Sequence, residues 1–510
     1  MTVKKTMVTK IIDRCRLPGV WAAVSLFSLW SASAGAAVDA GELYKKHCAE
    51  CHNPDRLGAM GPALLPQNLK RLRRPAAARV ITSGRPATQM PAFGDKLTGE
   101  QIQALVDFVY TPLPEVPRWG MKEIRASHLT PNRPEDLADE PVFKADMENL
   151  FIVVELGDHH ATLLDGDKFE PIYRFPTRFA LHGGPKYGRN GRYVYFASRD
   201  GWISKFDIYN LKYVAEVRAG INTRNLAVSA DGRYVIAANY LPHNLVVLDA
   251  DDLQPLKVIP AADDAGHSSR VSAVYTAAPR QSFIAALKDI PEVWEIDYGN
   301  RERPFSVRRI RVKDYLDDFF MNQDYTRIVG TSRSGGGQVV DLDSGKAVDS
   351  LALPGMPHLS SGITWDYKGR RVLATPNIKE GSVTVIDMQT WDMVKRIETL
   401  GPGFFMRSHE NSPYAWVDVF FGPNKDAMHV IDKRTLEIVK TLRPAPGKTS
   451  AHIEFTKDGS HALLSIWDDD GALIVYDAKT LEEVKRIPMR KPSGKYNVHN
   501  KLTRSSGTSH

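Results

Sequence analysis

Val246-Val247-Leu248-Asp249 is the stretch that decides the fold of most of this chain, because close variants of it recur. Each variant is an apolar, strand-like run that ends in aspartate, as in Val385-Ile386-Asp387, Val430-Ile431-Asp432 and Val475-Tyr476-Asp477. The aspartates lie 42 to 48 residues apart, and the series is Asp165, Asp207, Asp249, Asp297, Asp341, Asp387, Asp432 and Asp477. A period of this length built from short strands is typical of a β-propeller. Eight aspartates predict eight blades, and a seven-bladed ring with one additional hairpin is the alternative.

Turn signals recur at a matching place in the repeat. They are Asn190-Gly191, Asp231-Gly232, Lys368-Gly369 and Asp458-Gly459, all typical of hairpins. We expect each aspartate of the series to cap a turn within its blade, which is a structural role. The repeat therefore predicts an all-β propeller over residues 146–510.

N-terminal to the repeat, the run Cys48-Ala49-Glu50-Cys51-His52 has the attachment pattern of c-type haem. The two thiols would add to the haem vinyl groups, and His52 would bind the iron. A disulfide between Cys48 and Cys51 is one alternative. A zinc site is another, but zinc needs four ligands and the sequence has no second cysteine pair.

A second iron ligand is expected at Met90, in Thr88-Gln89-Met90-Pro91-Ala92-Phe93. Class I cytochromes c present their methionine in this way, before a C-terminal helix. Thr98 to Tyr110 has the spacing of that helix, with Thr98 as its N-cap. Met60 is the competing ligand. Residues 38–111 are therefore predicted to be a small all-α class I cytochrome c domain.

The first 37 residues have the three parts of a secretory signal. Five Lys and Arg residues come first, an apolar stretch runs from Leu17 to Trp30, and small residues end at Ala36-Ala37. We expect cleavage near Ala36/Ala37, no stable membrane anchor and a periplasmic protein. An uncleaved membrane anchor is the alternative, but the apolar stretch is short for a span.

Composition limits the classes of function. The chain has 510 residues, 43% hydrophobic and 25% charged, which is ordinary for a globular protein and argues against disorder. Its formal charge of +7 falls to about +3 without residues 1–37, and no basic run with interleaved aromatic residues exists. Nucleic acid is therefore not an expected partner. Residues 112–145, rich in proline and charge, are predicted to be a linker.

Ionisable residues recur 23 to 29 positions before each aspartate of the last seven repeats. This phase is expected at the start of each blade's innermost strand, close to the ring axis. The residues are His182, Arg224, Arg270, Asp317, His358, His409 and His452. Imidazoles bind iron or move protons, and guanidiniums pair with carboxylates. A metal macrocycle that carries several carboxylates is the expected occupant. For any one of them, a hydrogen-bonded loop residue is the alternative.

With both domains in view, the chain resembles the cytochrome cd1 nitrite reductase family and its relatives in haem d1 biosynthesis. The stretches that carry the resemblance are Phe179-Ala180-Leu181-His182, Asn222-Thr223-Arg224, Ser269-Arg270-Val271, Met356-Pro357-His358, Ser408-His409-Glu410-Asn411-Ser412 and Gly494-Lys495-Tyr496-Asn497-Val498. The resemblance implies His182 as proximal ligand of haem d1, Arg224 and Arg270 near its carboxylates, and His358 as a distal catalytic histidine.

One departure distinguishes among these relatives. Tyr315-Leu316-Asp317-Asp318-Phe319-Phe320 stands where the reductases carry their other distal histidine, so an imidazole is replaced by Asp317. Proton donation to bound nitrite needs that pair of imidazoles. The sequence is therefore most similar to the dihydro-haem d1 dehydrogenases, which oxidise a propionate of the precursor to an acrylate.

The resemblance implies an oxidoreductase with one covalent haem c and a non-covalent haem d1 precursor as substrate. We expect His409 to be the base, with His358 and Asp317 also catalytic, and Cys48, Cys51, His182, Arg224, Arg270 and His452 to bind cofactor or substrate. The expected metal ligands are His52, Met90 and His182. Electrons would pass through haem c to a periplasmic acceptor, and nitrite reductase or other assembly proteins are possible partners. A nitrite reductase with an altered pocket and a non-catalytic haem d1 carrier are the alternatives.

Overall fold

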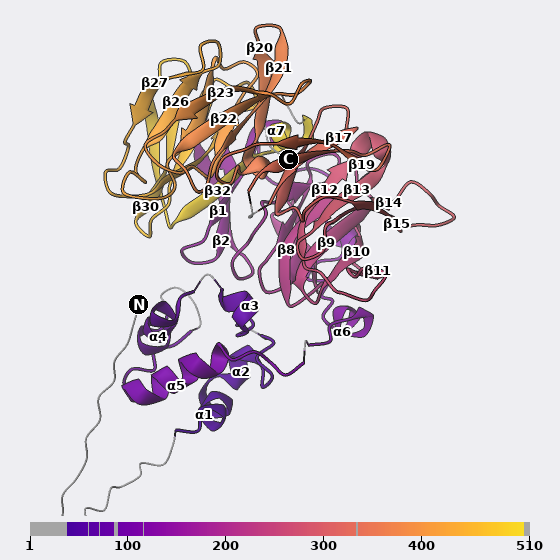
Figure 1. The fold of residues 1–510 in the computed structure, drawn as a ribbon. Coiled ribbons are helices and arrows are strands. Elements are labelled where there is room, and N and C mark those ends of the chain that lie inside the picture. Colours follow the sequence, from indigo (N-terminus) through magenta and orange to yellow (C-terminus); the bar gives the residue numbers. More distant parts are fainter. Residues whose placement is uncertain are drawn as a thin grey trace, which may run out of the picture. The chain divides into compact units, whose positions relative to one another are not determined.

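The structure is a computed structural model that describes residues 38–59, 61–70, 72–85, 90–115, 117–332 and 335–503. The predicted signal peptide and Met60 lie outside these residues. Ala40–His510 form one compact unit, drawn in Figure 1. Helices occupy its N-terminal part and strands the remainder, as the sequence predicts. No helix in the described part of the chain has the length and apolar character of a membrane span.

The helices of the N-terminal part pack around one apolar cluster that includes Tyr44, Phe93 and Leu105. They are α1 (Ala40–His47), α2 (Ala49–His52), α3 (Pro66–Leu69), α4 (Arg74–Ser83) and α5 (Gly99–Val109). α5 is the helix expected after Met90. The Thr98 side chain accepts from Gln101 N, and the Gln101 side chain accepts from Thr98 N, so a full capping box fixes its start.

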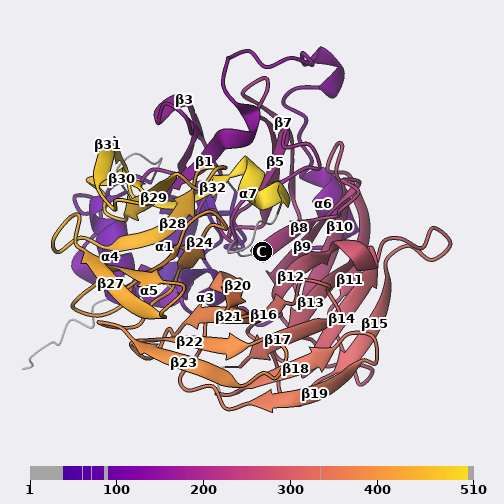
Figure 2. The same cartoon turned by 90° about the horizontal axis from the view of Figure 1, so that it is seen from above.

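Eight four-stranded antiparallel sheets follow within the described residues and form a ring, which Figure 2 shows from above. From the outer to the innermost strand they are β3 (Glu170–Pro176), β2 (His160–Asp165), β1 (Leu150–Glu155) and β32 (Pro492–Asn497); β7 (Lys212–Arg218), β6 (Trp202–Asp207), β5 (Tyr193–Ala197) and β4 (Lys186–Tyr187); β11 (Pro255–Pro260), β10 (Asn244–Asp249), β9 (Tyr234–Leu241) and β8 (Asn222–Val228); and β15 (Ser306–Arg311), β14 (Glu292–Asp297), β13 (Ser282–Leu287) and β12 (Val271–Ala277).

The other four sheets continue in the same order. They are β19 (Lys346–Leu351), β18 (Gly337–Asp341), β17 (Arg327–Thr331) and β16 (Asp318–Met321); β23 (Met393–Glu398), β22 (Ser382–Asp387), β21 (Arg370–Pro376) and β20 (Ile363–Tyr367); β27 (Glu437–Leu442), β26 (Met428–Asp432), β25 (Tyr414–Asp418) and β24 (Met406–Ser408); and β31 (Glu483–Met489), β30 (Gly471–Asp477), β29 (His461–Ile466) and β28 (Ser450–Phe455). The predicted eight-bladed propeller is confirmed.

Each aspartate of the repeat ends the third strand of its blade, counted from the axis. Its carboxylate accepts backbone N–H groups of the next turn, as Asp387 does from Gln389 N at 2.8 Å and Thr390 N at 3.1 Å. The expected turn-capping role is therefore confirmed. The ring closes because β32, at the C-terminal end, pairs with β1 to complete the first sheet.

Between the helical part and the ring, residues 112–145 are not structureless. They contain α6 (Met121–Ala126), and Ile124 and Trp119 pack with the core between the second and third sheets. α7 (Val498–Thr503) follows β32 directly. Apolar clusters of this kind fill the spaces between neighbouring blades and hold the inner strands in place.

Two innermost strands carry a bulge at an ionisable residue. The pairing register of β8 with β9 shifts between Thr223 and Asn225, which leaves Arg224 unpaired in the ladder. That of β28 with β29 shifts between Ala451 and Ile453 and leaves out His452, whose φ is +50°. A bulge turns the extra residue away from the alternation of the strand. Both positions are among the seven that the sequence placed close to the ring axis.

Candidate active site

The haem-attachment run lies where a helix begins. Cys48 precedes α2, which contains Cys51 and His52, and the two thiols are not joined in a disulfide. His52 is buried, and its Nδ1 donates to Pro62 O at 2.8 Å. Because the carbonyl only accepts, Nδ1 carries the hydrogen and Nε2 keeps a lone pair for iron. Burial lowers the pKa of His52, which favours this neutral form.

Met90 packs at the edge of the same cluster as Tyr44 and Phe93. Its carbonyl accepts from Arg85 N at 3.1 Å, which closes the loop after α4. Gly61 passes close over the His52 ring, since a Cβ there would lie 2.6 Å from His52 Cε1. The helical domain thus presents a thiol pair, an oriented imidazole and a nearby thioether. These donor types fit a c-type haem. Met90 as the distal ligand stays a prediction.

In the propeller, His182 and Arg224 meet across two blades. His182 precedes β4, and its Nδ1 is 2.7 Å from the backbone oxygen of Arg224 on β8. The Arg224 guanidinium lies 2.9 Å from the imidazole, and Arg199 Nη2 lies 2.9 Å from His182 Nε2. The imidazole thus has one nitrogen fixed by a carbonyl and the other among two cations. A site for iron with adjacent carboxylates needs this set of donors.

His358 is the centre of a second group. Its Nδ1 donates to Phe404 O at 2.6 Å, and the two rings stack with centroids 4.0 Å apart. Its Nε2 faces Ser360 Oγ at 3.1 Å and Asp318 Oδ2 at 4.0 Å. Burial lowers the pKa of His358, although the Asp318 carboxylate opposes this. The result is a neutral imidazole whose accepting nitrogen points at a hydroxyl and a carboxylate.

Asp318 connects His358 to the blade that contains β12. Tyr275 on β12 donates its hydroxyl to Asp318 Oδ1 at 3.1 Å, and Ser360 N donates to Asp318 Oδ2 at 3.0 Å. Burial, and then the charge of Asp318, raises the pKa of Tyr275 well above its usual value. The charge of Arg224 lowers the pKa of both Tyr275 and His358, so Arg224 lies near both residues.

His452 is the third histidine of this cluster, after His182 and His358. Its ring lies 4.8 Å from that of Phe405 and 5.3 Å from that of Tyr496, and Phe405 lies 6.3 Å from His358. Burial, followed by the nearby Lys495, lowers the pKa of His452 well below its usual value. Its ring nitrogens have no hydrogen-bond partner within the described residues. A buried imidazole without partners fits a position beside a bound ligand.

His409 does not lie at the expected phase. It follows β24 and lies in the turn before β25, at the far end of the innermost strand. Its Nδ1 accepts from Asn411 N at 3.1 Å, its ring lies 6.1 Å from Phe455, and a Cβ at Gly459 would lie 2.3 Å from it. The stretch at the phase of His358 is instead Phe404-Phe405. The count failed because it allowed 23 to 29 positions, and 23 positions before Asp432 lies beyond the end of β24, which has only three residues.

Arg270 and Asp317 are engaged elsewhere. Arg270 pairs with Asp289 through Nε at 2.8 Å and a second guanidinium contact. Asp317 forms a buried ion pair with Lys288, so its charge is compensated there. The carboxylate that faces His358 belongs to the next residue, Asp318. The sequence located the stretch but placed Asp317, not Asp318, at the expected phase, because it could not show which of two neighbouring side chains turns towards His358.

Several pocket residues were not predicted. They are Arg199, Tyr275, Asp318, Ser360, Asp418 and Tyr496. One signal was available for Asp418, since it ends the apolar run Tyr414-Ala415-Trp416-Val417 without belonging to the series of repeat aspartates. Arg199 and Tyr275 lie off the predicted phase and carry no such signal.

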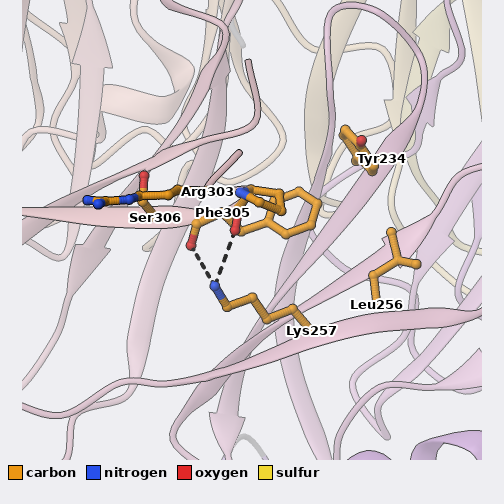
Figure 3. A pocket seen from close by; sticks show the side chains of 7 residues that line it. Tyr234, Leu256, Lys257, Arg303, Phe305 and Ser306 are labelled. Atoms are coloured by element: carbon orange, nitrogen blue, oxygen red, sulfur yellow. Dashed lines mark hydrogen bonds between the residues drawn. The ribbon is translucent and has the colours of Figure 1, made fainter. Parts of the chain in front are cut away.

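Surface hollows lie away from these imidazoles. The one in Figure 3 has a volume of about 600 Å³ between β11 and β15, where Lys257 Nζ donates to Phe305 O at 3.1 Å and to Pro304 O at 3.3 Å. Another, of about 340 Å³, is lined by residues such as Arg189, Tyr193 and Asp231. Neither contains a histidine, so the axial cluster is the better candidate site.

The helical part and the ring are joined by hydrogen bonds and apolar contacts. Arg218 donates to Leu57 O and to Gly58 O, and Gly58 N in turn donates to His52 O at 2.9 Å. Asn68 Nδ2 donates to Ile221 O at 2.9 Å, and Ile221 packs with Ala63, Leu65 and Leu241. The loop around His52 thus contacts the start of β8, which carries Arg224.

Comparison with known proteins now identifies both parts. The family model described as "Cytochrome D1 heme domain" matches residues 145–501, and that described as "Cytochrome C oxidase, cbb3-type, subunit III" matches residues 35–109. The chain belongs to the cytochrome d1 haem domain family. The expected combination of a c-type cytochrome domain with a d1 haem domain is confirmed.

Within this family, one dehydrogenase is much more similar to this chain than a nitrite reductase is. Dihydro-heme d1 dehydrogenase of Pseudomonas aeruginosa is 58% identical over 482 residues, which cover 93% of this chain and 98% of the relative. Nitrite reductase of Stutzerimonas stutzeri is 24% identical over 554 residues, covering 95% and 98%. The solved structure "Dihydro-heme d1 dehydrogenase NirN in complex with DHE" matches with a TM-score of 0.89 and 59% identity, covering 91% of this chain and all of that one. The predicted resemblance to the dehydrogenases is confirmed.

Proposed function

We propose that this protein oxidises the dihydro precursor of haem d1, converting a propionate side chain into an acrylate. The observation that supports this best is the presence of two imidazole groups, His358 with Asp318 and His182 with Arg224, in a chain this similar to a dihydro-haem d1 dehydrogenase. A protein that only stored the ligand would need His182 and Arg224 for binding, but it would not need His358 and Asp318.

Binding is assigned to the cations and His182. His182 Nε2 is the expected ligand of the substrate iron, since Nδ1 is held by the Arg224 carbonyl. Arg224 and Arg199 are in place to pair with carboxylates of the macrocycle, because guanidinium and carboxylate form strong two-point hydrogen bonds. Such a pair would also fix the propionate in a reactive geometry.

Proton removal is assigned to His358. Oxidation of –CH₂–CH₂–COO⁻ to –CH=CH–COO⁻ releases two protons and two electrons, so a base must accept a proton from carbon. His358 is neutral, with its accepting Nε2 turned to Ser360 and Asp318. The Asp318 carboxylate would stabilise the imidazolium that forms, while the Phe404 carbonyl keeps the hydrogen on Nδ1.

The two electrons need an acceptor that takes one at a time. Cys48, Cys51 and His52, with Met90 as the expected second ligand, would hold haem c, which would supply one-electron redox chemistry. The contacts among Pro62, Ala63, Ile221 and the start of β8 offer a short protein path from the Arg224 side of the pocket to His52. A periplasmic acceptor would take up these electrons, with nitrite reductase or other haem d1 assembly proteins as candidate partners.

Export is part of this proposal. Residues 1–37 have the pattern of a signal peptide, with cleavage near Ala36/Ala37. Attachment of haem c takes place outside the cytoplasm, so the haem-attachment run and the signal pattern support the same location. Mass spectrometry of the exported protein would show both the new N-terminus and the covalent haem.

A single-turnover experiment tests the activity. The protein with haem c is mixed with the dihydro precursor and excess oxidant, and the absorption spectrum is followed with time. Conversion to the haem d1 spectrum supports the dehydrogenase. Binding without conversion replaces it with the carrier, and vigorous nitric oxide formation when haem d1, nitrite and an electron donor are supplied favours the altered reductase.

A further inference from the structure

A single buried carboxylate contacts both the loop beside His358 and the backbone of His452. Asp418, at the end of β25, is fully buried. Its Oδ1 accepts from Phe404 N at 2.7 Å and from Phe405 N at 3.0 Å, while its Oδ2 accepts from His452 N at 3.3 Å. None of these three partners lies in the strand of Asp418, so the carboxylate connects a loop and the next blade.

The first of these contacts determines the position of Phe404. The Phe404 peptide donates its N–H to Asp418, and the Phe404 carbonyl accepts from His358 Nδ1 at 2.6 Å. The Phe404 ring also stacks on His358. A shift of this residue would release Nδ1, and the hydrogen could then move to Nε2. Nε2 would thereby lose the lone pair with which it acts as a base.

The second contact holds a strained backbone. His452 has φ of +50°, a region that residues with a Cβ rarely adopt, and it is the extra residue of the β28 bulge. Its N–H is bonded to Asp418, and its carbonyl accepts from Lys495 Nζ. Buried charged side chains therefore fix both the backbone N–H and the backbone carbonyl of His452. These two contacts keep the His452 ring against Phe405 and Tyr496.

The surroundings of Asp418 are those of a supporting group rather than a reacting one. Lys495 and Arg407 are the cations that act on it, and both are buried. Burial raises the pKa of Asp418 to about 7, against its three backbone hydrogen bonds and Lys495. Its oxygens are occupied by backbone N–H groups, so neither is directed at a bound molecule.

We propose that Asp418 is a positioning residue that fixes the tautomer of His358 through Phe404 and the bulge of His452 directly. This inference rests on the proposed function for its kinetic readout. Asp418 acts through other residues, and both halves of its role can be separated because they use different oxygens.

Two substitutions make that separation. In Asp418→Asn the amide oxygen still accepts from Phe404 N and Phe405 N, while the NH₂ group faces His452 N and cannot accept. Asp418→Ala removes all three hydrogen bonds. Asp387→Ala is the matched control, since Asp387 is a buried aspartate that accepts two backbone N–H groups in a neighbouring blade.

The experiment measures precursor affinity and single-turnover conversion in the protein with haem c. Asp418→Asn should weaken affinity about 5- to 10-fold, the worth of one hydrogen bond, with a conversion rate close to that of the parent. Asp418→Ala should weaken affinity similarly and also slow conversion about 10- to 100-fold, part of the usual contribution of a base. Asp387→Ala should change neither quantity.

A second readout does not depend on activity. In reduced, diamagnetic protein labelled with ¹⁵N-histidine, the His358 signal, assigned by its loss in His358→Gln, should report a hydrogen on Nδ1 in the parent and in Asp418→Asn. Asp418→Ala should give a mixture of tautomers. If the parent fails to convert precursor, the proposed function fails, but this signal still tests the positioning of His358.

The outcomes that overturn the inference are distinct. Parent-like conversion with an unchanged His358 signal in Asp418→Ala removes the role at His358, and equal slowing by Asp387→Ala reduces it to general stability. If Asp418→Ala does not fold, Asp418→Asn alone tests the inference. If Asp418→Asn slows conversion as severely as His358→Gln does, the two effects do not use separate oxygens, which contradicts the inference. Unchanged affinity in Asp418→Asn overturns the support of His452.

Discussion

The helical domain and the propeller assemble their candidate iron sites in opposite ways. In the helical domain Cys48, Cys51 and His52 are neighbours in the chain, and one turn of helix brings them together. In the propeller, His182, His358 and His452 come from three blades. Backbone carbonyls of other segments orient His182 and His358, and the backbone N–H of His452 donates to the Asp418 carboxylate. A site of the first kind tolerates small changes in the surrounding fold, whereas the second depends on the relative positions of blades.

The largest effect should distinguish two histidines of the propeller. His358→Ala is expected to slow precursor conversion about 10²- to 10⁴-fold, the usual contribution of a positioned base. His409→Ala should remain close to the parent, because His409 lies in the turn after β24 and contacts Asn411 and Phe455 instead. Single-turnover spectra of both variants measure this difference.

The reverse result would restore the role that the sequence predicted for His409. It would also mean that the turn after β24 reaches the substrate. Normal precursor affinity in both variants is the control, since neither residue is assigned to binding.

The next effect concerns two arginines predicted for the same task. Arg224→Ala should weaken binding of the precursor about 10- to 150-fold, because it removes a charge-assisted hydrogen bond to a carboxylate. Arg270→Ala should change affinity little, since Arg270 already pairs with Asp289. Spectral titration with the precursor measures both. Equal losses would show that Arg270 leaves Asp289 when the ligand binds.

In the helical domain, a single substitution should act on one property only. Met90→Ala should keep haem c attached through Cys48 and Cys51 but lower its reduction potential, because a thioether favours the reduced iron. Precursor affinity in the propeller should not change. A redox titration followed at the haem c bands measures the shift, and an unchanged potential would favour Met60 or a histidine as distal ligand.

The smallest effect uses a histidine of the propeller that lies outside both candidate iron sites. His429 on β26 is buried, accepts from Leu400 N at Nε2 (3.1 Å) and contacts Thr441 Oγ1 through Nδ1 (2.8 Å). Burial, followed by Arg443, lowers its pKa to about 4. Because this value lies below the unfolded one of about 6.5, its stabilising contribution is present above pH 6.5 and is lost as pH falls towards 4.

His429→Gln should therefore reduce the acid sensitivity of folding. The slope of the unfolding free energy between pH 6.5 and 4 should fall by at most about 1.4 kcal/mol per pH unit. Denaturant unfolding at several pH values measures this slope, with pH 8 as the reference at which the imidazole does not titrate. An unchanged slope would mean that His429 has the same pKa in the folded and the unfolded protein.

The fold was predictable to a large extent, because its signals are local. The capping aspartates form hydrogen bonds with residues two or three positions away, as Asp477 does with Lys479 and Thr480. The helix after Met90 is likewise set by Thr98 and Gln101. What the repeat could not show is that β32 closes the first blade, since that pairing joins residues more than 300 positions apart.

By itself, the sequence determined the haem-attachment run, the eight blades and the family, since each depends on residue types at short or regular spacing. Only the tertiary structure decided which ionisable side chains converge. Bulges turn Arg224 and His452 out of their ladders, the short β24 carries His409 past the expected phase, and Asp318 rather than Asp317 faces His358. The physical reason is that a side chain's direction depends on the register and length of its strand, which are fixed by pairing with distant segments.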